Sequence, residues 1–479
     1  MLFDTPVYFV FLALVVLIYW RLPWRKQNLL LLAVSYFFYG WWDWRFLGLI
    51  LISTVVDFNC AKYIAGSENP WRRRLLLALS LVLNLTFLGF FKYFNFFVDS
   101  LSGALHTIGI AYVPTLVLKI LLPPGISFYT FQEIAYMVDV YHKKLPASRS
   151  FVDYALFISL FPHLIAGPIQ RPSHLLPQVQ KPRVYDPDRF FGGMMLILTG
   201  LFRKCVIADN CGLLANAAFN GSFGHPSLAV LALGTYAFAW QIYGDFSGYS
   251  DIARGSAQLM GFHFMVNFRQ PYLACSLQDF WRRWHISLSS WLRDYLYIPL
   301  GGSRHGEAKT YRNLMATMLL GGLWHGANWT YVVWGGIHGV GLAVERLFQG
   351  VFQRGERPQP APAAQSLFSP GAWVRRILWF HLVCLAWIFF RASSVSRVFD
   401  YLGGLGTVGW RPEFLPAFQF LALFSIPLFL LDVLLEYREE EYPFEKTPQM
   451  YQLAYAASML VLVTLFSAND VNAFIYFQF

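Results

Sequence analysis

Long apolar runs recur along almost the whole chain, separated by short polar, basic or proline-containing segments. An α-helix needs about 20 mostly apolar residues to cross a bilayer. The pattern predicts an all-α polytopic membrane protein, a bundle of roughly 10–13 tilted and re-entrant helices. The runs that we interpret as membrane helices are 6–20, 29–39, 46–64, 75–94, 116–141, 151–165, 190–201, 228–243, 311–323, 330–347, 376–390, 416–435 and 453–465.

Composition supports this class. Hydrophobic residues make up 56% of the 479 residues and charged residues only 13%, whereas soluble domains carry about 25% charged residues. We therefore expect a single membrane domain over 1–479. The segment 354–370, with several prolines and alanines, reads as a flexible and basic cytoplasmic linker.

The net charge of +10 comes from short basic clusters between the apolar runs, at 21–26, 71–74 and 143–149 among others. With the predicted helices, these three clusters fall on one side of the membrane, which is the positive-inside pattern. The pattern predicts cytoplasmic basic loops and a periplasmic N-terminus, and it argues against nucleic-acid binding. The first run lacks a basic leader and a small-residue cleavage site, so we interpret it as a retained helix.

Two segments are predicted to interrupt helices. Pro123-Pro124-Gly125 must break or kink the run that contains it. The segment 244–251 combines two glycines with Asp245 and Asp251 after an apolar run. We expect a break there that lines a polar cavity.

The segment 276–295 concentrates tryptophan, arginine and histidine between the apolar runs. Ser276 and Asp279 resemble a capping box that starts a helix. Helical spacing places Trp281, Trp284 and His285 on one face. We expect one amphipathic helix, interfacial or re-entrant, with His285 turned toward protein.

His325 is the strongest candidate for catalysis. No nucleotide-binding loop, zinc-protease motif or serine-hydrolase elbow is present, and the five cysteines have no ligand spacing, so no metal or disulfide is expected. A histidine is well suited to accept a proton near neutral pH. It follows Gly321-Gly322 and precedes Gly326, so backbone and substrate could approach it closely. A packed histidine between helices is an equally good interpretation from the residues alone.

Other polar groups near these motifs have two interpretations each. Arg282, Arg283 and Arg293 suit the phosphates of an anionic donor such as coenzyme A, or lipid headgroups. Asp245 and Asp251 would orient a histidine or, the favoured interpretation, form structural ion pairs, for which Arg254 is a candidate partner. His285, among tryptophans, favours packing. The other nine histidines are interpreted as loop or packing residues.

The motifs together resemble the membrane-bound O-acyltransferase family, most closely its bacterial polysaccharide-acetylating branch, typified by alginate O-acetylation. The resemblance covers roughly residues 1–400, with the core motifs within 240–345. The segments that carry it are GISFYTFQ at 125–132, FPHLIAGP at 161–168, DFSGYSD at 245–251, DFWRRWHISLSSWLRDY at 279–295, IPLGG at 298–302 and LWHGANW at 323–329.

The resemblance implies a helix bundle around a transmembrane funnel or tunnel. It implies that His325 is the residue essential for acyl transfer and that His285, the second motif histidine, is also catalytic, assisting the reaction or positioning the acyl group. The residues expected to bind the donor are Trp281, Arg282, Arg283 and Trp284, and those expected to support the site are Asp245, Asp251, Asp294 and Asn328.

The resemblance also implies a reaction. An acetyl group, from cytoplasmic acetyl-CoA with no metal or prosthetic group, crosses the bacterial inner membrane. Periplasmic partner proteins with a serine-hydrolase-like fold then place it on an exopolysaccharide. Two alternatives stay open: a D-alanyl or lipid O-acyltransferase of the same family, and a polysaccharide or solute transporter, although no internal repeat is visible.

Overall fold

A computed structural model describes residues 1–110, 118–352, 367–468 and 475. Most of the linker predicted at 354–370 lies outside the described residues. Within the described residues every regular element is a helix and there is no β-strand, which confirms the all-α class.

Among the residues that the structure describes, six helical segments are long and apolar enough to cross a membrane. This finding confirms the prediction of a polytopic membrane protein. The larger number of 10–13 helices stays a prediction. The six are Trp44–Ala65, Pro70–Thr107, Pro187–Phe219, Pro370–Arg391, Phe414–Arg438 and Gln449–Phe466.

The chain divides into two compact units, one formed by 1–193 with 253–265 and the other by 194–252 with 266–479. Helix α12 (Leu228–Leu259) contributes residues to both. The single domain over 1–479 stays a prediction.

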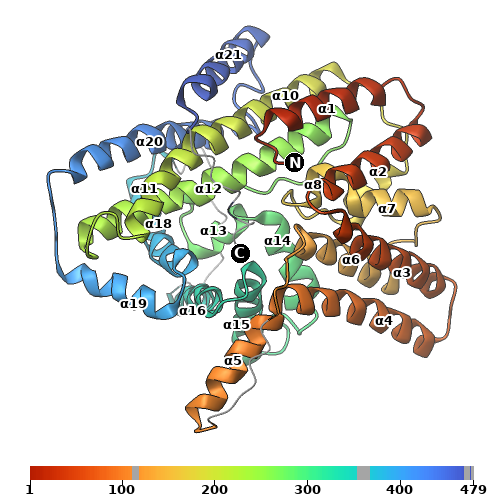
Figure 1. Ribbon diagram of the computed structural model, residues 1–479, viewed down its shortest axis with the longest axis horizontal. Coiled ribbons are helices and arrows are strands. Elements are labelled where there is room, and N and C mark those ends of the chain that lie inside the picture. The colour runs from red at the N-terminus through yellow and green to blue at the C-terminus, as the bar shows by residue number, and fades with distance from the viewer. Residues whose placement is uncertain (111–117, 353–366, 469–474, 476–479) are drawn as a thin grey trace. The chain divides into compact units, whose positions relative to one another are not determined.

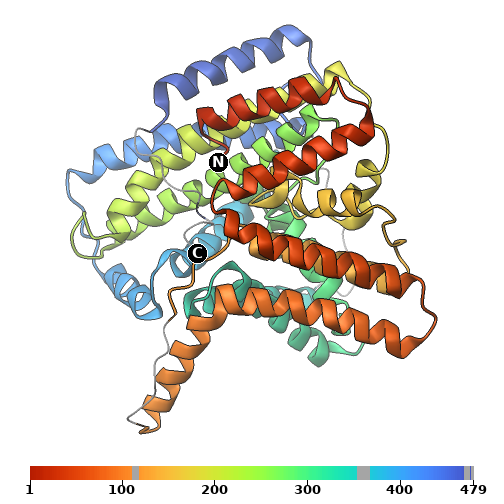
Figure 2. The ribbon, with the colours of Figure 1, turned by 45° about the vertical axis from the view of Figure 1, so that its right-hand side comes forward.

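Unit 1 is built from helices, of which α3 and α4 run antiparallel side by side (Figure 2), whereas α4 continues through Gly89–Tyr93 into α5. The predicted interruption at 123–125 is confirmed, because a helix starts directly after Gly125, whose φ is 72°. The helices of this unit are α1 (Pro6–Tyr19), α2 (Trp24–Gly40), α3 (Leu47–Ala65), α4 (Pro70–Leu88), α5 (Phe94–Thr107), α6 (Ile126–Tyr141), α7 (Phe151–Ser159), α8 (Phe161–Leu164) and α9 (Pro172–Val179).

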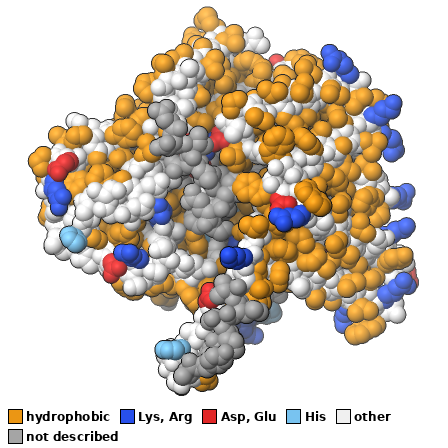
Figure 3. Space-filling view, in the orientation of Figure 1, with side chains coloured by type: hydrophobic (Ala, Val, Ile, Leu, Met, Phe, Trp, Pro, Cys, Tyr) orange, Lys and Arg blue, Asp and Glu red, His pale blue; other side chains and the backbone are white. Residues whose placement is uncertain are grey.

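The α1–α2, α3–α4 and α6–α7 connections of unit 1 lie along one edge (Figure 1), and Lys and Arg side chains gather at that edge (Figure 3). Arg73, at the start of α4, donates to the carbonyl oxygen of Tyr141 at the end of α6. Arg183 donates to the Tyr19 hydroxyl at 2.8 Å and to Asn28 Oδ1 at 2.7 Å. The three basic loops therefore lie on the same side of this unit.

Unit 2 contains most of the core motif region. Helix α10 (Pro187–Leu201) begins in unit 1, enters unit 2 at residue 194 and continues through a π-helical stretch, Phe202–Ala208, into α11 (Asp209–Phe219). The other helices are α13 (Leu277–Arg283), α14 (Ile286–Leu292), α15 (Glu307–His325), α16 (Trp329–Phe352), α18 (Pro370–Arg391), α19 (Val395–Gly403), α20 (Phe414–Arg438) and α21 (Gln449–Phe466).

The break predicted at 244–251 is wrong, because α12 runs unbroken through this segment. Its glycines serve close helix packing instead: a Cβ on Gly244 would lie 2.8 Å from the Arg203 carbonyl oxygen, and one on Gly248 would lie 2.6 Å from that of Gly200.

The two carboxylates of the same segment are buried in ion pairs rather than lining a cavity. Asp245 lies 2.9 Å from Lys204 Nζ, and Asp251 lies 2.8 Å from an Arg203 guanidinium nitrogen. The favoured interpretation of structural pairing is confirmed, with these two partners. A buried charge is tolerated in such a place when an opposite charge compensates it.

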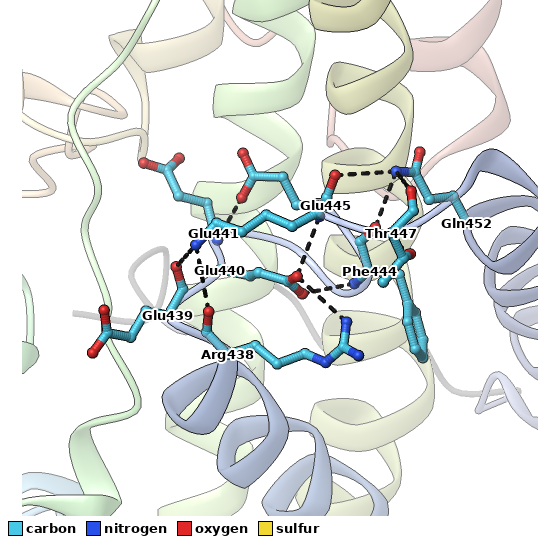
Figure 4. Close-up of polar contacts among 9 residues, drawn as sticks. Arg438, Glu439, Glu440, Glu441, Phe444, Glu445, Thr447 and Gln452 are labelled. Atoms are coloured by element: carbon cyan, nitrogen blue, oxygen red, sulfur yellow. Dashed lines mark hydrogen bonds and ion pairs between the residues drawn. The ribbon is translucent and has the colours of Figure 1, made fainter. Parts of the chain in front are cut away.

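The acidic connection between α20 and α21 is an ordered turn built around Glu440 (Figure 4). The buried Glu440 carboxylate accepts from the backbone N–H groups of Phe444 at 3.0 Å and Lys446 at 3.2 Å, and it pairs with Arg438. The turn fixes the end of α20, which also carries Glu436.

Candidate active site

The segment 276–295 is two short helices with a break between them, so the single amphipathic helix predicted there is wrong. Its start is as expected, since the Ser276 hydroxyl accepts from the backbone N–H of Asp279 at 2.9 Å. Helix α13 ends at Arg283, and α14 begins at Ile286. Between them His285 adopts the left-handed conformation, φ 43° and ψ 53°, which non-glycine residues rarely adopt.

Asn267 holds this break. Its backbone carbonyl accepts from Ile286 N–H at 2.9 Å, and its side-chain Oδ1 accepts from the Ser287 N–H at 3.3 Å and hydroxyl at 2.9 Å. The same oxygen lies 3.1 Å from His285 Nδ1. Because Oδ1 already accepts from a backbone N–H, it is an acceptor, and His285 Nδ1 must be the donor. Nε2 is then the nitrogen that keeps a lone pair.

His285 is fully buried, as expected for a histidine turned toward protein. It lies outside the six long apolar segments. Burial lowers its pKa to about 3, so the imidazole is neutral at physiological pH. Its ring packs edge-on against Phe246, with 4.7 Å between centroids, and against Trp324 at 5.8 Å.

His325 is the last residue of α15, where the extended backbone of Gly326 ends the helix. The chain therefore leaves the helix at Gly326, whereas Gly321 and Gly322 lie within the helix. The His325 side chain is 2% exposed, and its ring lies 5.1 Å from that of Trp334 and 5.3 Å from that of Phe390.

The crossing of α15 and α16 fixes the position of His325. A Cβ on Gly322 would lie 2.2 Å from the Tyr331 carbonyl oxygen, and one on Gly335 would lie 2.2 Å from that of Met318. A Cβ on Gly326 would lie 2.2 Å from the Tyr331 ring. The helices can meet this closely only because these three positions lack side chains.

These two local structures bring the motif histidines together. The ring centroids of His285 and His325 are 6.4 Å apart, with 61° between their planes. The two histidines, 40 positions apart in sequence, therefore lie at one buried site. This site is on the side of α15 that faces α14.

A cavity of about 440 Å³ leads to His325. The exposed side chains of Arg282 and Arg293 line the open mouth of this cavity. The nearly inaccessible side chain of His325 lines its buried end. The other lining residues are Gln278, Trp281, Ile286, Leu288, Ser289, Ser290, Leu292, Tyr297, Leu314, Thr317, Met318, Gly321, Trp334 and Leu342.

The cavity wall contains polar groups with no protein partner. Among the described residues, Arg282 makes no ion pair or side-chain hydrogen bond, and the buried indole N–H groups of Trp281 and Trp334 have no acceptor. Buried donors are nearly always satisfied in native proteins. These groups therefore suit a polar ligand in the cavity.

Two predicted donor-binding residues do not line this cavity. Arg283 pairs with Glu436 and Asp279, both at 2.8 Å, so it ties α13 to α20. Trp284 is buried between Phe280 and Trp387. Only Trp281 and Arg282 of the four lie on the cavity wall.

The supporting residues are also distributed. Asp245 and Asp251 belong to the ion pairs with Lys204 and Arg203 described above. Asp294 pairs with Arg293 of the cavity mouth at 2.8 Å. Asn328 accepts from the Thr330 N–H at 3.0 Å and donates to the Ser393 carbonyl oxygen at 3.0 Å, which holds the turn after His325.

Sequence reasoning missed Asn267 and Phe390, which contact the two histidines. Asn267 lies outside every motif, and Phe390 is one aromatic residue of an apolar helix. Only long-range hydrogen bonding and ring packing single them out, so no local signal could have identified them.

We expect Asn267→Ala to lower acyl-transfer activity more than Ser287→Ala does. The first change removes the acceptor of His285 Nδ1 and of two Ser287 groups, whereas the second removes one donor. Each buried group left without a partner costs about 1–3 kcal/mol. Thermal unfolding in detergent and a transfer assay measure both effects. Equal behaviour of the two variants would contradict the role of Asn267.

Comparison with known proteins places these features in a family. Residues 142–368 match the model of the membrane-bound O-acyltransferase family. The chain is 45% identical over 399 residues to the probable alginate O-acetylase AlgI of Azotobacter vinelandii, covering 83% of this chain and 76% of that protein. It is 37% identical over 439 residues to the peptidoglycan O-acetyltransferase of Helicobacter pylori, covering 85% and 80%. It is 28% identical over 239 residues to the teichoic acid D-alanyltransferase of Streptococcus thermophilus, covering 46% and 56%.

Proposed function

The chain belongs to the membrane-bound O-acyltransferase family and is an O-acyltransferase. We propose that it takes an acetyl group from cytoplasmic acetyl-CoA and passes it across the membrane. The acetyl group then serves for O-acetylation of an extracytoplasmic polysaccharide such as alginate. The observation that carries the proposal is the cavity that begins at exposed arginines and ends at His325.

In the proposed reaction, a hydroxyl group of the acceptor attacks the carbonyl carbon of the thioester, and His325 accepts the hydroxyl proton as general base. The new C–O bond forms as the C–S bond breaks, and the proton passes from His325 to the leaving thiolate. A buried imidazole at the end of a cavity suits this step, because water is excluded there.

His285 acts as a positioning residue. Its neutral ring, held by Asn267, packs between Phe246 and Trp324 next to the His325 ring. The His285 ring thereby holds the neighbouring side chains in place, so that the acyl group and His325 are aligned.

The donor would be held at the cavity mouth and wall. Arg282 supplies a guanidinium for the phosphates of the coenzyme, and Arg293 lies at the same mouth. The indole N–H groups of Trp281 and Trp334 suit the amide or thioester carbonyl oxygens of a chain that enters the cavity.

We expect Arg282→Gln to raise the KM for acetyl-CoA about tenfold, because the variant loses one charge-assisted contact to the donor. The stability of the protein should change little. Arg283→Gln is the matched change, one residue away. It leaves Glu436 buried without its cation, so we expect a lower unfolding temperature instead. Steady-state kinetics and thermal unfolding separate the two. A large KM effect from Arg283→Gln alone would contradict the assignment.

The basic edge of unit 1 supports an orientation with those loops in the cytoplasm and the N-terminus in the periplasm of a bacterial inner membrane. Periplasmic partners with a serine-hydrolase-like fold would then receive the acetyl group and place it on the polymer.

The test is to incubate the purified protein in lipid nanodiscs with labelled acetyl-CoA, with and without candidate periplasmic partners. Label on a partner or on added polysaccharide is the expected result. No transfer from acetyl-CoA, with transfer from an acylated carrier protein, would instead favour the D-alanyl alternative. Family membership argues against the transporter alternative.

A further inference from the structure

A second cavity of about 460 Å³ lies in unit 2, among the end of α11, the segment that follows it, the end of α18 and the start of α19. It is bordered by Arg391, Arg397, His225 and Tyr401, together with Asn220 and Ser393. No carboxylate belongs to this wall as far as the described residues go. A polar cavity with cations and no anions is typical of a site for a negatively charged ligand.

The two arginines are available to such a ligand. Arg391 donates to Asn216 Oδ1 at 2.7 Å and lies over the Phe219 ring, but neither Arg391 nor Arg397 forms an ion pair within the described part of the chain. Arg397 is exposed and makes no side-chain hydrogen bond there.

A third cation lies close to the same loop. The guanidinium of Arg411 is 3.6 Å from where a Cβ on Gly224 would be, and Gly224, with φ 86°, lines the cavity. Backbone hydrogen bonds from Leu228 and Ala229 to the carbonyl oxygens of Thr407 and Val408 hold the two segments together.

This cavity borders the turn that follows His325. Asn328 of that turn donates to the carbonyl oxygen of Ser393, which lines the second cavity. Phe390, which packs on His325, directly precedes Arg391. The first cavity thus approaches His325 from the α13 side, and the second lies beyond the α15–α16 turn.

We propose that this second cavity binds the carboxylate of a uronate sugar, one unit of an anionic polysaccharide, next to the turn that follows His325, so that the polymer is held at the protein while a partner places the acetyl group on it. Guanidinium groups hold a carboxylate by paired hydrogen bonds. The side chains of Asn220 and Ser393 suit sugar hydroxyls, as does the Tyr401 hydroxyl oxygen as an acceptor, since that hydroxyl donates to the Phe219 carbonyl oxygen, and the cavity volume fits a small ligand. The identification of a sugar rests on the proposed function, whereas the carboxylate site rests on the arginines.

The test uses the full-length protein in nanodiscs and a short oligouronate as the probe, with binding measured by calorimetry. We expect Arg397→Gln and Arg391→Gln each to weaken binding about tenfold. Arg375→Gln is the matched control, because Arg375 is an exposed arginine near the other end of α18. It should bind as the wild type does. Because Arg391 also contacts Asn216, Arg397→Gln remains informative if the Arg391 variant does not fold.

A carboxyl-reduced, neutral oligosaccharide is the second arm and should not bind measurably. Equal binding of the neutral and charged oligosaccharides, or an equal effect of Arg375→Gln, would overturn the proposal. The proposal would also be overturned if the oligouronate did not bind and a periplasmic polypeptide bound through these arginines instead. Binding does not require acetyl-CoA, so these results are distinguishable from a failure of acetyl transfer.

Discussion

His325→Ala is expected to lower acetyl transfer by at least about a hundredfold, the smaller end of what a positioned general base contributes. The substitution removes the imidazole at the buried end of the donor cavity, where no other histidine is among the lining residues that the structure describes. Transfer of label from acetyl-CoA by protein in nanodiscs measures the loss, at a donor concentration above KM.

The control for this experiment is another buried histidine. His163 is fully buried in unit 1, where its Nδ1 lies 3.1 Å from Gln132 Nε2, and it does not line the donor cavity. His163→Ala also removes a buried imidazole, so it reports the general cost of such a change. If a correctly inserted His325→Ala protein transferred acetyl groups at the wild-type rate, the assignment of His325 as the general base would be contradicted.

Local signals were sufficient for the helices and for several of their ends. Six of the apolar runs lie in the six segments that are long and apolar enough to span a membrane in the described part of the chain, Pro123-Pro124-Gly125 predicted the start of α6, and Ser276 predicted the start of α13. Each of these depends on residues within a few positions of one another, which a sequence displays directly.

The structure departs from the sequence prediction where distant residues decide the conformation. Helical spacing continues through His285, but Asn267, 18 positions earlier, holds the backbone of 285–287 in a break. Two glycines and two aspartates predicted a break in α12, yet Arg203 and Lys204 compensate the aspartates and the glycines admit a neighbouring helix. Tertiary partners of this kind override local preference.

The division of roles between Arg282 and Arg283 has the same origin. Successive residues on a helix point about 100° apart, so one can face the cavity and the other the protein. The motif contains both, and only the position of Glu436, far along the chain, shows that Arg283 faces α20.

Gly335→Ala and the neighbouring Gly336→Ala are expected to have opposite effects on stability. A Cβ at 335 would lie 2.2 Å from the backbone carbonyl oxygen of Met318, which has no room to move within α15, whereas a Cβ at 336 would lie 3.4 Å from Leu319 Cδ2. The first change should destabilise the protein by about 1–3 kcal/mol or more, as overpacking does. The second should be neutral or stabilising by up to about 1 kcal/mol, because alanine is the better helix former.

The same pair tests whether the helix crossing positions the base. Separating α15 from α16 moves His325 away from Trp334 and the cavity end, so acetyl transfer should fall in the folded fraction of Gly335→Ala protein and stay unchanged in Gly336→Ala. Thermal unfolding in detergent gives the stability, and initial rates normalised to folded protein give the activity. If Gly335→Ala destabilised the protein but its folded fraction transferred acetyl at the wild-type rate, the crossing would matter for folding alone, and the placement of His325 would depend on Gly326 and the Asn328 turn instead.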